Sequence, residues 1–145
     1  SHGMSAYNPI SYHNGSVWPH DNAIVAAGLM RYGFAEAAHR VMAAMVDAST
    51  YFAARLPELF AGLGRDENGF PVSYPASCSP QAWAAASPLL HLRTMLRFEP
   101  DIRNGELHLA PILPDWIGEH LHVSEIPDGL TIVRAPRAAT ADEQR

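Results

Sequence analysis

The stretch AIVAAGLMRYGFAEAAHRVMAAMVDASTYFAAR, residues 23–55, decides the fold. It contains two runs, residues 23–32 and 34–55, in which apolar residues recur every three or four positions, as they do along one face of an α-helix. Gly33 alone separates the two runs and suits a left-handed helix end. Because so short a link allows only a tight reversal, the stretch predicts two antiparallel helices, a helical hairpin.

The same spacing predicts which side chains of the hairpin are buried. The apolar face of the first helix is predicted to hold Ile24, Val25, Gly28 and Leu29. The face of the second helix is predicted to hold Ala38, Val41, Met42, Met45, Ala48 and Phe52.

Residues 7–22, YNPISYHNGSVWPHDN, precede the hairpin and have a very different composition. Two prolines, a glycine and three asparagines disfavour a regular helix or a central strand, so this stretch is predicted to be a loop. So many aromatic rings and hydrogen-bonding side chains favour recognition of a polar ligand with flat apolar faces, such as a sugar. The alternative is that Trp18 and the tyrosines pin the loop to the core. Asp21 is placed to cap the first helix, a role that is compatible with ligand contact.

After the hairpin, Glu58 follows Pro57 among apolar residues and glycines, which makes it a candidate for a partly desolvated acid or base. Residues 65–69 are predicted to form a surface turn, and residues 70–78 an extended segment. Ser79 is predicted to cap a further helix that runs to about Arg97, with a kink or interruption at Pro88.

The C-terminal part alternates between apolar and polar residues over 106–109, 121–123 and 130–133, which predicts a small antiparallel β appendage. We therefore predict a tag remnant at 1–3, a helical region at 4–101, the appendage at 102–136 and a flexible tail at 137–145. His108, His120 and His122 lie in the appendage, but no cysteine or paired carboxylate accompanies them. We predict neither a metal site nor a cofactor.

Composition excludes several functional classes. With 145 residues and 48% hydrophobic residues, the chain is long and apolar enough to bury a core. The net charge of −5 with dispersed charges argues against nucleic acid and anionic lipid as partners. The sequence has no run resembling a membrane span or a signal peptide, and its single cysteine suits a reducing compartment. We expect a cytoplasmic protein.

Three quoted segments carry a resemblance to a known family: YNPISYHNGSVWPHDNAIVAAGL, then RLPELFAG, then PVSYPASCSPQAWAAASPLLHLR. In this order they resemble the C-terminal part of the bacterial amylo-α-1,6-glucosidase, or glycogen-debranching-like, family, over roughly residues 7–115. The resemblance implies a glucoamylase-like (α/α)6 toroid built from helical hairpins, of which this chain supplies a part. The expected fold is therefore mainly α, a partial toroid with the small β appendage.

The resemblance also implies a function. In that superfamily the general base of an inverting glycosidase is a glutamate in a loop, followed by an extended segment and a tryptophan-bearing helix, and Glu58 matches this arrangement. The implied partner is an α-glucan oligosaccharide. Its implied contacts are His13, Asn14, Trp18, His20, Asp21, Tyr74 and Trp83. The general acid of the family lies earlier in the toroid, so we expect this chain to be a C-terminal fragment that is inactive alone.

Two alternatives remain open from the sequence. The chain can be a non-enzymatic carbohydrate-binding or assembly module that self-associates or pairs with the rest of a toroid, because missing helices leave apolar faces uncovered. It can also be a glucoamylase-, trehalase- or phosphorylase-like relative, because the loops that select the leaving group and acceptor are not present in this sequence.

Overall fold

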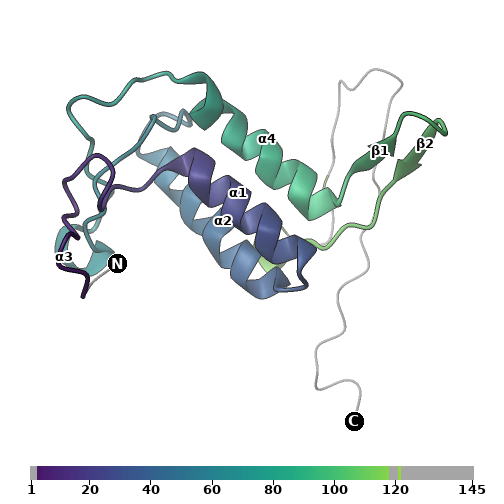
Figure 1. The fold of residues 1–145 in the computed structure, drawn as a ribbon, viewed down its shortest axis with the longest axis horizontal. Helices are drawn as coiled ribbons and strands as arrows, with labels where there is room; N and C mark the ends of the chain where they lie inside the picture. Colours follow the sequence, from purple (N-terminus) through teal and green to yellow (C-terminus); the bar gives the residue numbers. More distant parts are fainter. Residues whose placement is uncertain (1–2, 118–120, 122–145) are drawn as a thin grey trace, which may run out of the picture. The chain divides into compact units, whose positions relative to one another are not determined.

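The chain is mainly helical, with a small two-stranded antiparallel sheet (Figure 1). A computed structural model describes residues 3–117 and residue 121. Contacts divide the chain into a unit of residues 1–91 and a unit of residues 92–145, which are described separately. The mainly helical class and the small sheet confirm the coarse prediction from the sequence.

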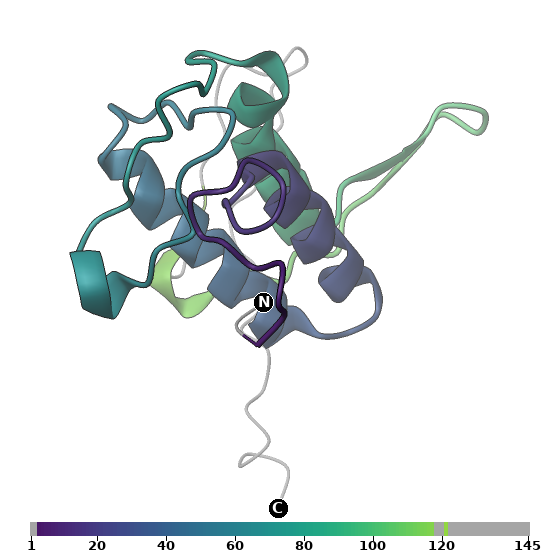
Figure 2. The same ribbon diagram turned by 60° about the vertical axis from the view of Figure 1, so that its left-hand side comes forward.

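The predicted helical hairpin is present. Helix α1, Pro19–Arg31, and helix α2, Ala35–Thr50, lie side by side and reverse at Gly33, which has a φ of 86° (Figures 1 and 2). The amide of Gly33 donates to the carbonyl of Met30, and the amide of Phe34 donates to that of Leu29. These bonds pair carbonyls at the end of α1 that would otherwise lack an intrahelical partner.

Helix α1 begins four residues earlier than predicted, and the prediction that Asp21 caps it is wrong. The N-cap residue is Trp18, whose backbone is extended and whose side chain makes no capping hydrogen bond. Pro19 takes the first helical position, where its missing N–H costs nothing. Asp21 therefore lies in the first turn, where its negative charge still opposes the positive end of the helix dipole.

The buried face of α1 also differs from the prediction. Ala23 and Ala26 are almost fully buried, whereas Ile24 and Val25 are 52% and 55% exposed. Small alanine side chains on this face suit the packing of α1 against α2, and the larger residues lie outward. Two branched apolar side chains are thus left on the surface of the first unit.

Helix α2 buries most of its predicted stripe: Ala38, Met42, Met45 and Ala48. It ends at Thr50, five residues before the predicted end at Arg55. Ala53 and Ala54 have φ values of 52° and 61°, and a left-handed backbone does not continue a right-handed helix.

Two β-bridges bind together three segments that are distant in the sequence. Val17 pairs with Phe60, and Phe60 pairs with Ser73, both in the antiparallel sense. Val17 and Phe60 exchange backbone hydrogen bonds of 2.8 and 3.0 Å. Phe60 is buried against Met45, Ala48 and Leu56, so these bridges are anchored on the core beside α2. The bridges hold the N-terminal loop, the segment after α2 and the extended segment in one layer.

Two glycines permit a close approach of backbones within this layer. The amide of Gly62 donates to the carbonyl of Pro9 at 2.8 Å, and the Tyr7 hydroxyl donates to the carbonyl of Gly62 at 3.0 Å. A Cβ atom on Gly62 would overlap the carbonyl oxygen of Gly15, and a Cβ atom on Gly15 would overlap that of Asn8. Both positions therefore accept a side chain only if the neighbouring backbone shifts.

The next segments depart from the predicted boundaries. The predicted surface turn is a short helix, α3, Arg65–Asn68, whose first residue forms an ion pair with Asp47. Helix α4, Ala82–Leu96, starts three residues after Ser79, so Ser79 is not its cap. The Ser79–Pro80 peptide is cis. Pro88 lies inside α4, which continues through it to Leu96.

The second unit contains a β-hairpin. Strand β1, Glu99–Asp101, pairs antiparallel with strand β2, Glu106–His108. The Asp101 carboxylate accepts hydrogen bonds from Asn104 and Arg103, which lower its pKa and hold the turn. A 3-10 helix, η1, Asp115–Ile117, follows. Apart from Leu121, the predicted strands at 121–123 and 130–133 and the tail at 137–145 lie outside the described residues, as do His120 and His122.

No helix within the described ranges 3–117 and 121 is long and apolar enough to cross a membrane.

His91 on α4 is 3% exposed, and neither ring nitrogen has a hydrogen-bond partner among the described residues. Burial lowers the pKa of His91 below the ordinary value of 6.5. As pH falls, the His91 side chain of the unfolded chain takes up a proton near pH 6.5. In the folded chain the same side chain takes up this proton only at a lower pH. We expect the free energy of unfolding to fall as pH drops below about 6.5, by at most about 1.4 kcal/mol per pH unit for this one proton.

Urea denaturation between pH 5 and pH 8 measures this loss. In His91→Leu the pH dependence below about pH 6.5 should be shallower than in the unmodified chain. His108→Gln serves as the control, because it removes an exposed imidazole and leaves the buried one in place. Equal slopes for the unmodified chain and His91→Leu would contradict the prediction.

Candidate functional site

Glu58 is the buried carboxylate of the first unit, with 7% of the residue exposed. It lies between Pro57 and Leu59, both buried, in the segment that links α2 to α3. The extended segment runs beside it, because the Glu58 amide donates to the carbonyl of Cys78 at 3.0 Å. The Leu59 amide donates to the Ser77 hydroxyl at 3.3 Å. These two hydrogen bonds thus hold the backbone at Glu58 against the extended segment at Ser77 and Cys78.

Three groups donate hydrogen bonds to the Glu58 carboxylate. The Tyr12 hydroxyl and the Gln81 Nε2 amide donate to Oε1 at 2.8 and 2.9 Å, and the Cys78 backbone amide donates to Oε2 at 3.2 Å. An ionised carboxylate offers about four lone-pair positions, so three donors leave about one position on Oε2. The hydrogen bond to Glu58, reinforced by burial and by the carboxylate charge, raises the pKa of Tyr12.

Aromatic rings from three segments gather beside this carboxylate. Their centroids lie 4.8 to 6.3 Å apart in successive pairs, the range in which aromatic rings attract one another. We call this set the aromatic cluster: Tyr12, His13, Trp18, His20, Tyr74 and Trp83.

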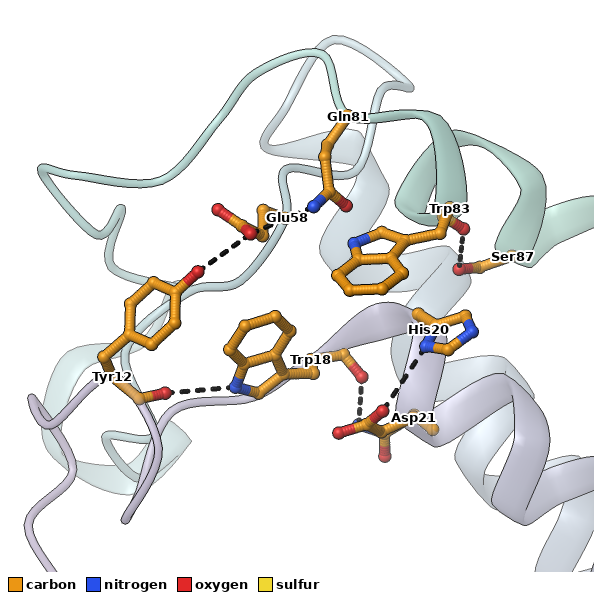
Figure 3. A network of polar contacts seen from close by, with 9 residues as sticks. Tyr12, Trp18, His20, Asp21, Glu58, Gln81, Trp83 and Ser87 are labelled. Carbon is orange, nitrogen blue, oxygen red and sulfur yellow. Dashed lines mark hydrogen bonds and ion pairs between the residues drawn. The ribbon is translucent and has the colours of Figure 1, made fainter.

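Helix starts and backbone hydrogen bonds place the two tryptophans of the aromatic cluster. The Trp18 indole donates to the carbonyl of Tyr12 at 3.1 Å, which closes the loop before α1 (Figure 3). Trp83 lies in the first turn of α4, and its ring stacks on His20 at 4.9 Å. The two indoles meet edge to face at 6.3 Å. The starts of α1 and α4 therefore build one wall of rings.

The structure brings together five of the seven predicted contact residues: His13, Trp18, His20, Tyr74 and Trp83. The other two lie at its margin. The Asp21 side chain is 68% exposed and pairs with His20 Nδ1 at 3.4 Å. Asn14 is exposed and borders a pocket with His13, without a hydrogen bond to Glu58. Their roles in ligand binding stay predictions.

Sequence reasoning missed Tyr12 and Gln81 as members of the site. Tyr12 belongs to the aromatic loop at residues 7–22, but its hydrogen-bond partner lies 46 positions later. Gln81 follows the predicted cap Ser79 by two positions, and it lies just before α4 and donates to a carboxylate 23 positions earlier. Contacts at such separations have no periodic signature in a sequence.

Over residues 3–117 and 121, no group of three or more histidine, cysteine, aspartate or glutamate side chains is arranged to hold a metal ion. His108, one of the three histidines considered above, pairs with Glu106 at 3.5 Å on the β-hairpin.

Comparison with models of known protein families gives no match, and comparison with curated protein sequences gives no significant relative. The fold and the site define a mainly helical protein with a buried, hydrogen-bonded carboxylate beside an aromatic cluster. Such an arrangement can take up a proton at the carboxylate and can present ring faces to a flat, uncharged ligand.

Proposed function

We propose that this chain contributes the general base and part of the sugar-binding surface of an inverting glycoside hydrolase that acts on α-glucans. The proposed activity is of the amylo-α-1,6-glucosidase, or glycogen-debranching, kind. The observation that carries the proposal is the Glu58 carboxylate, buried beside the aromatic cluster and held there by three donors. The helical hairpin is proposed as one repeat of an (α/α)6 toroid.

The environment of Glu58 suits a base that activates water. Tyr12 and Gln81 fix Oε1 by two hydrogen bonds, so the side chain is held in one orientation before any ligand arrives. We assign the remaining acceptor position on Oε2 to an O–H of the attacking water. As the water oxygen attacks the anomeric carbon, its proton passes to the carboxylate, and the bond from that carbon to the glycosidic oxygen breaks.

The aromatic cluster suits a sugar because pyranose rings have apolar faces and polar edges. Trp83 keeps 45% of its surface exposed although it stacks on His20, so part of the indole remains open to a ligand. Tyr74 and Trp18 extend the same surface toward Tyr12.

An inverting mechanism also needs a carboxylic acid that protonates the leaving oxygen, about 6.5 to 9.5 Å from the base. On the resemblance stated above, this acid belongs to an earlier part of the toroid, outside the present sequence. The chain is therefore proposed to supply one half of the catalytic pair.

A second candidate function is that of a non-enzymatic assembly module. The exposure of Ile24 and Val25 on α1 favours it, because a partner could bury these apolar side chains. This candidate and the first share the hairpin but differ in whether the site binds sugar.

Trp83→Ala is expected to weaken binding of maltooligosaccharides about ten-fold, because the variant loses a stacking surface. Calorimetric or NMR titration of the chain measures the dissociation constant. Trp116→Ala is the matched control, since Trp116 is exposed to nearly the same extent, 48% against 45%, and belongs to the second unit. Equal effects of the two substitutions would contradict the proposed site. An absence of sugar binding together with a concentration-dependent dimer in sedimentation would favour the assembly module.

A further inference from the structure

A pocket of about 380 Å³ lies in the N-terminal loop, apart from the hydrogen-bonded groups around Glu58. It is lined by Met4, Ala6, Tyr7 and residues 13–16. Backbone hydrogen bonds between Asn8 and Asn14 and between Ser11 and Ser16 close the loop that forms its wall. The Ser16 hydroxyl donates to the carbonyls of Ser11 and Tyr12, which fixes the loop further.

Among the described residues, the lining of this pocket is mostly apolar, with polar side chains from His13, Asn14 and Ser16. No aspartate, glutamate, lysine or arginine lines it among the residues that the structure describes, so no carboxylate, ammonium or guanidinium group is available there to pair with a charged ligand. The side chains of His13 and Asn14 have no hydrogen-bond partner in the part of the chain that the structure describes. Both therefore have donors and acceptors available for a ligand. The apolar surface and these free polar groups together fit a molecule that has apolar faces and several hydroxyl groups, such as a sugar.

The pocket adjoins the aromatic cluster through His13. The His13 ring lies 4.8 Å from the Tyr12 ring and stacks on Trp18 at 6.0 Å, with an angle of 7° between the planes. Tyr12 in turn donates to Glu58. The His13 imidazole therefore belongs both to the pocket lining and to the aromatic cluster beside the Glu58 carboxylate.

From this continuity we infer that the pocket is a second sugar subsite, which takes a neighbouring unit of the oligosaccharide whose cleaved linkage lies at Glu58. The inference rests on the proposed function and adds to it a preference for ligands longer than one sugar unit. In this arrangement Asn14 donates to and accepts from hydroxyl groups of the second unit. His13 contacts both units, because it lines the pocket and belongs to the aromatic cluster.

The test compares the affinities of methyl α-glucoside and maltotriose for the full chain and for Asn14→Ala, by NMR titration. The unmodified chain should bind maltotriose more tightly than methyl α-glucoside. Asn14→Ala removes only hydrogen bonds to the second unit, so its loss of affinity should be about three- to ten-fold larger for maltotriose than for the monosaccharide.

Asn14→Asp provides a second variant that preserves the size of the side chain. It removes the amide donors but keeps acceptor oxygens, so it should produce a selective loss in the same direction. Circular dichroism verifies that each variant keeps the helical content of the unmodified chain. Losses that are equal for the two ligands, or affinities that do not change in a folded variant, would overturn the subsite while leaving the proposed function in place. If the unmodified chain bound neither ligand, the subsite and the proposed sugar binding would both fail.

Discussion

Under the proposed function, Glu58→Gln is expected to lower the turnover of α-glucans about 10²- to 10⁴-fold in an enzyme that combines this chain with a general acid, the usual contribution of a general base. Binding of the oligosaccharide should stay within about two-fold. Glutamine preserves the size of the side chain and one acceptor oxygen for Tyr12 and Gln81, but it cannot take a proton from water at neutral pH. Steady-state kinetics and a parallel titration of binding separate the two effects.

Glu67→Gln is the matched control for this substitution, because Glu67 is an exposed glutamate on α3. It should leave both turnover and binding unchanged. If Glu58→Gln turned over substrate as fast as the unmodified enzyme, Glu58 would not be the general base. A loss of binding equal to the loss of turnover would instead assign Glu58 to ligand binding alone.

Gly62→Ala is expected to lower the free energy of unfolding by about 2 to 3 kcal/mol, near the upper end of the usual cost of overpacking. The added Cβ would overlap the carbonyl oxygen of Gly15, and backbone cannot move aside as a flexible side chain can. Moving it would strain the hydrogen bonds that join Gly62 to Pro9 and Tyr7. Urea denaturation of the two proteins measures the difference.

Gly28→Ala in α1 is the opposite case and the matched control. A Cβ at this helical position meets no atom within 4 Å, so the substitution should stabilise the chain by about 0.5 to 1 kcal/mol. The same chemical change should therefore have opposite signs at the two glycines. A Gly62→Ala protein as stable as the unmodified chain would show that the loops need not approach so closely.

The hairpin was predictable because its signals are local. The stripe from Ala38 to Ala48 has one dominant spacing, and Gly33 is a residue that easily adopts a positive φ. The face of α1 was not predictable in the same way. Alanine and isoleucine both satisfy an apolar pattern, and only the close packing of α1 on α2 selects the smaller side chains as the buried ones.

The site was predictable as a set of residue types but not as a set of contacts. Trp18, Trp83 and Glu58 could be selected from their neighbours along the chain, whereas the bond from Tyr12 to Glu58 depends on the bridges that align Val17, Phe60 and Ser73. The error at Asp21 has a similar origin. Aspartate is a common N-cap residue, and Asp21 lies near the expected helix start. The helix begins earlier, at Pro19, with Trp18 as the N-cap residue in an extended conformation.

The sequence separations at Glu58 also bear on the order in which the protein forms. Its three donors are 20, 23 and 46 positions away, whereas the α1–α2 reversal closes over a few residues. Closing long loops costs chain entropy before any contact offsets it, so helical hairpins form faster than such distant pairings. Helical content should therefore return early in refolding, and the carboxylate should acquire its partners late. A helical signal alone would not show that a chain had assembled its site.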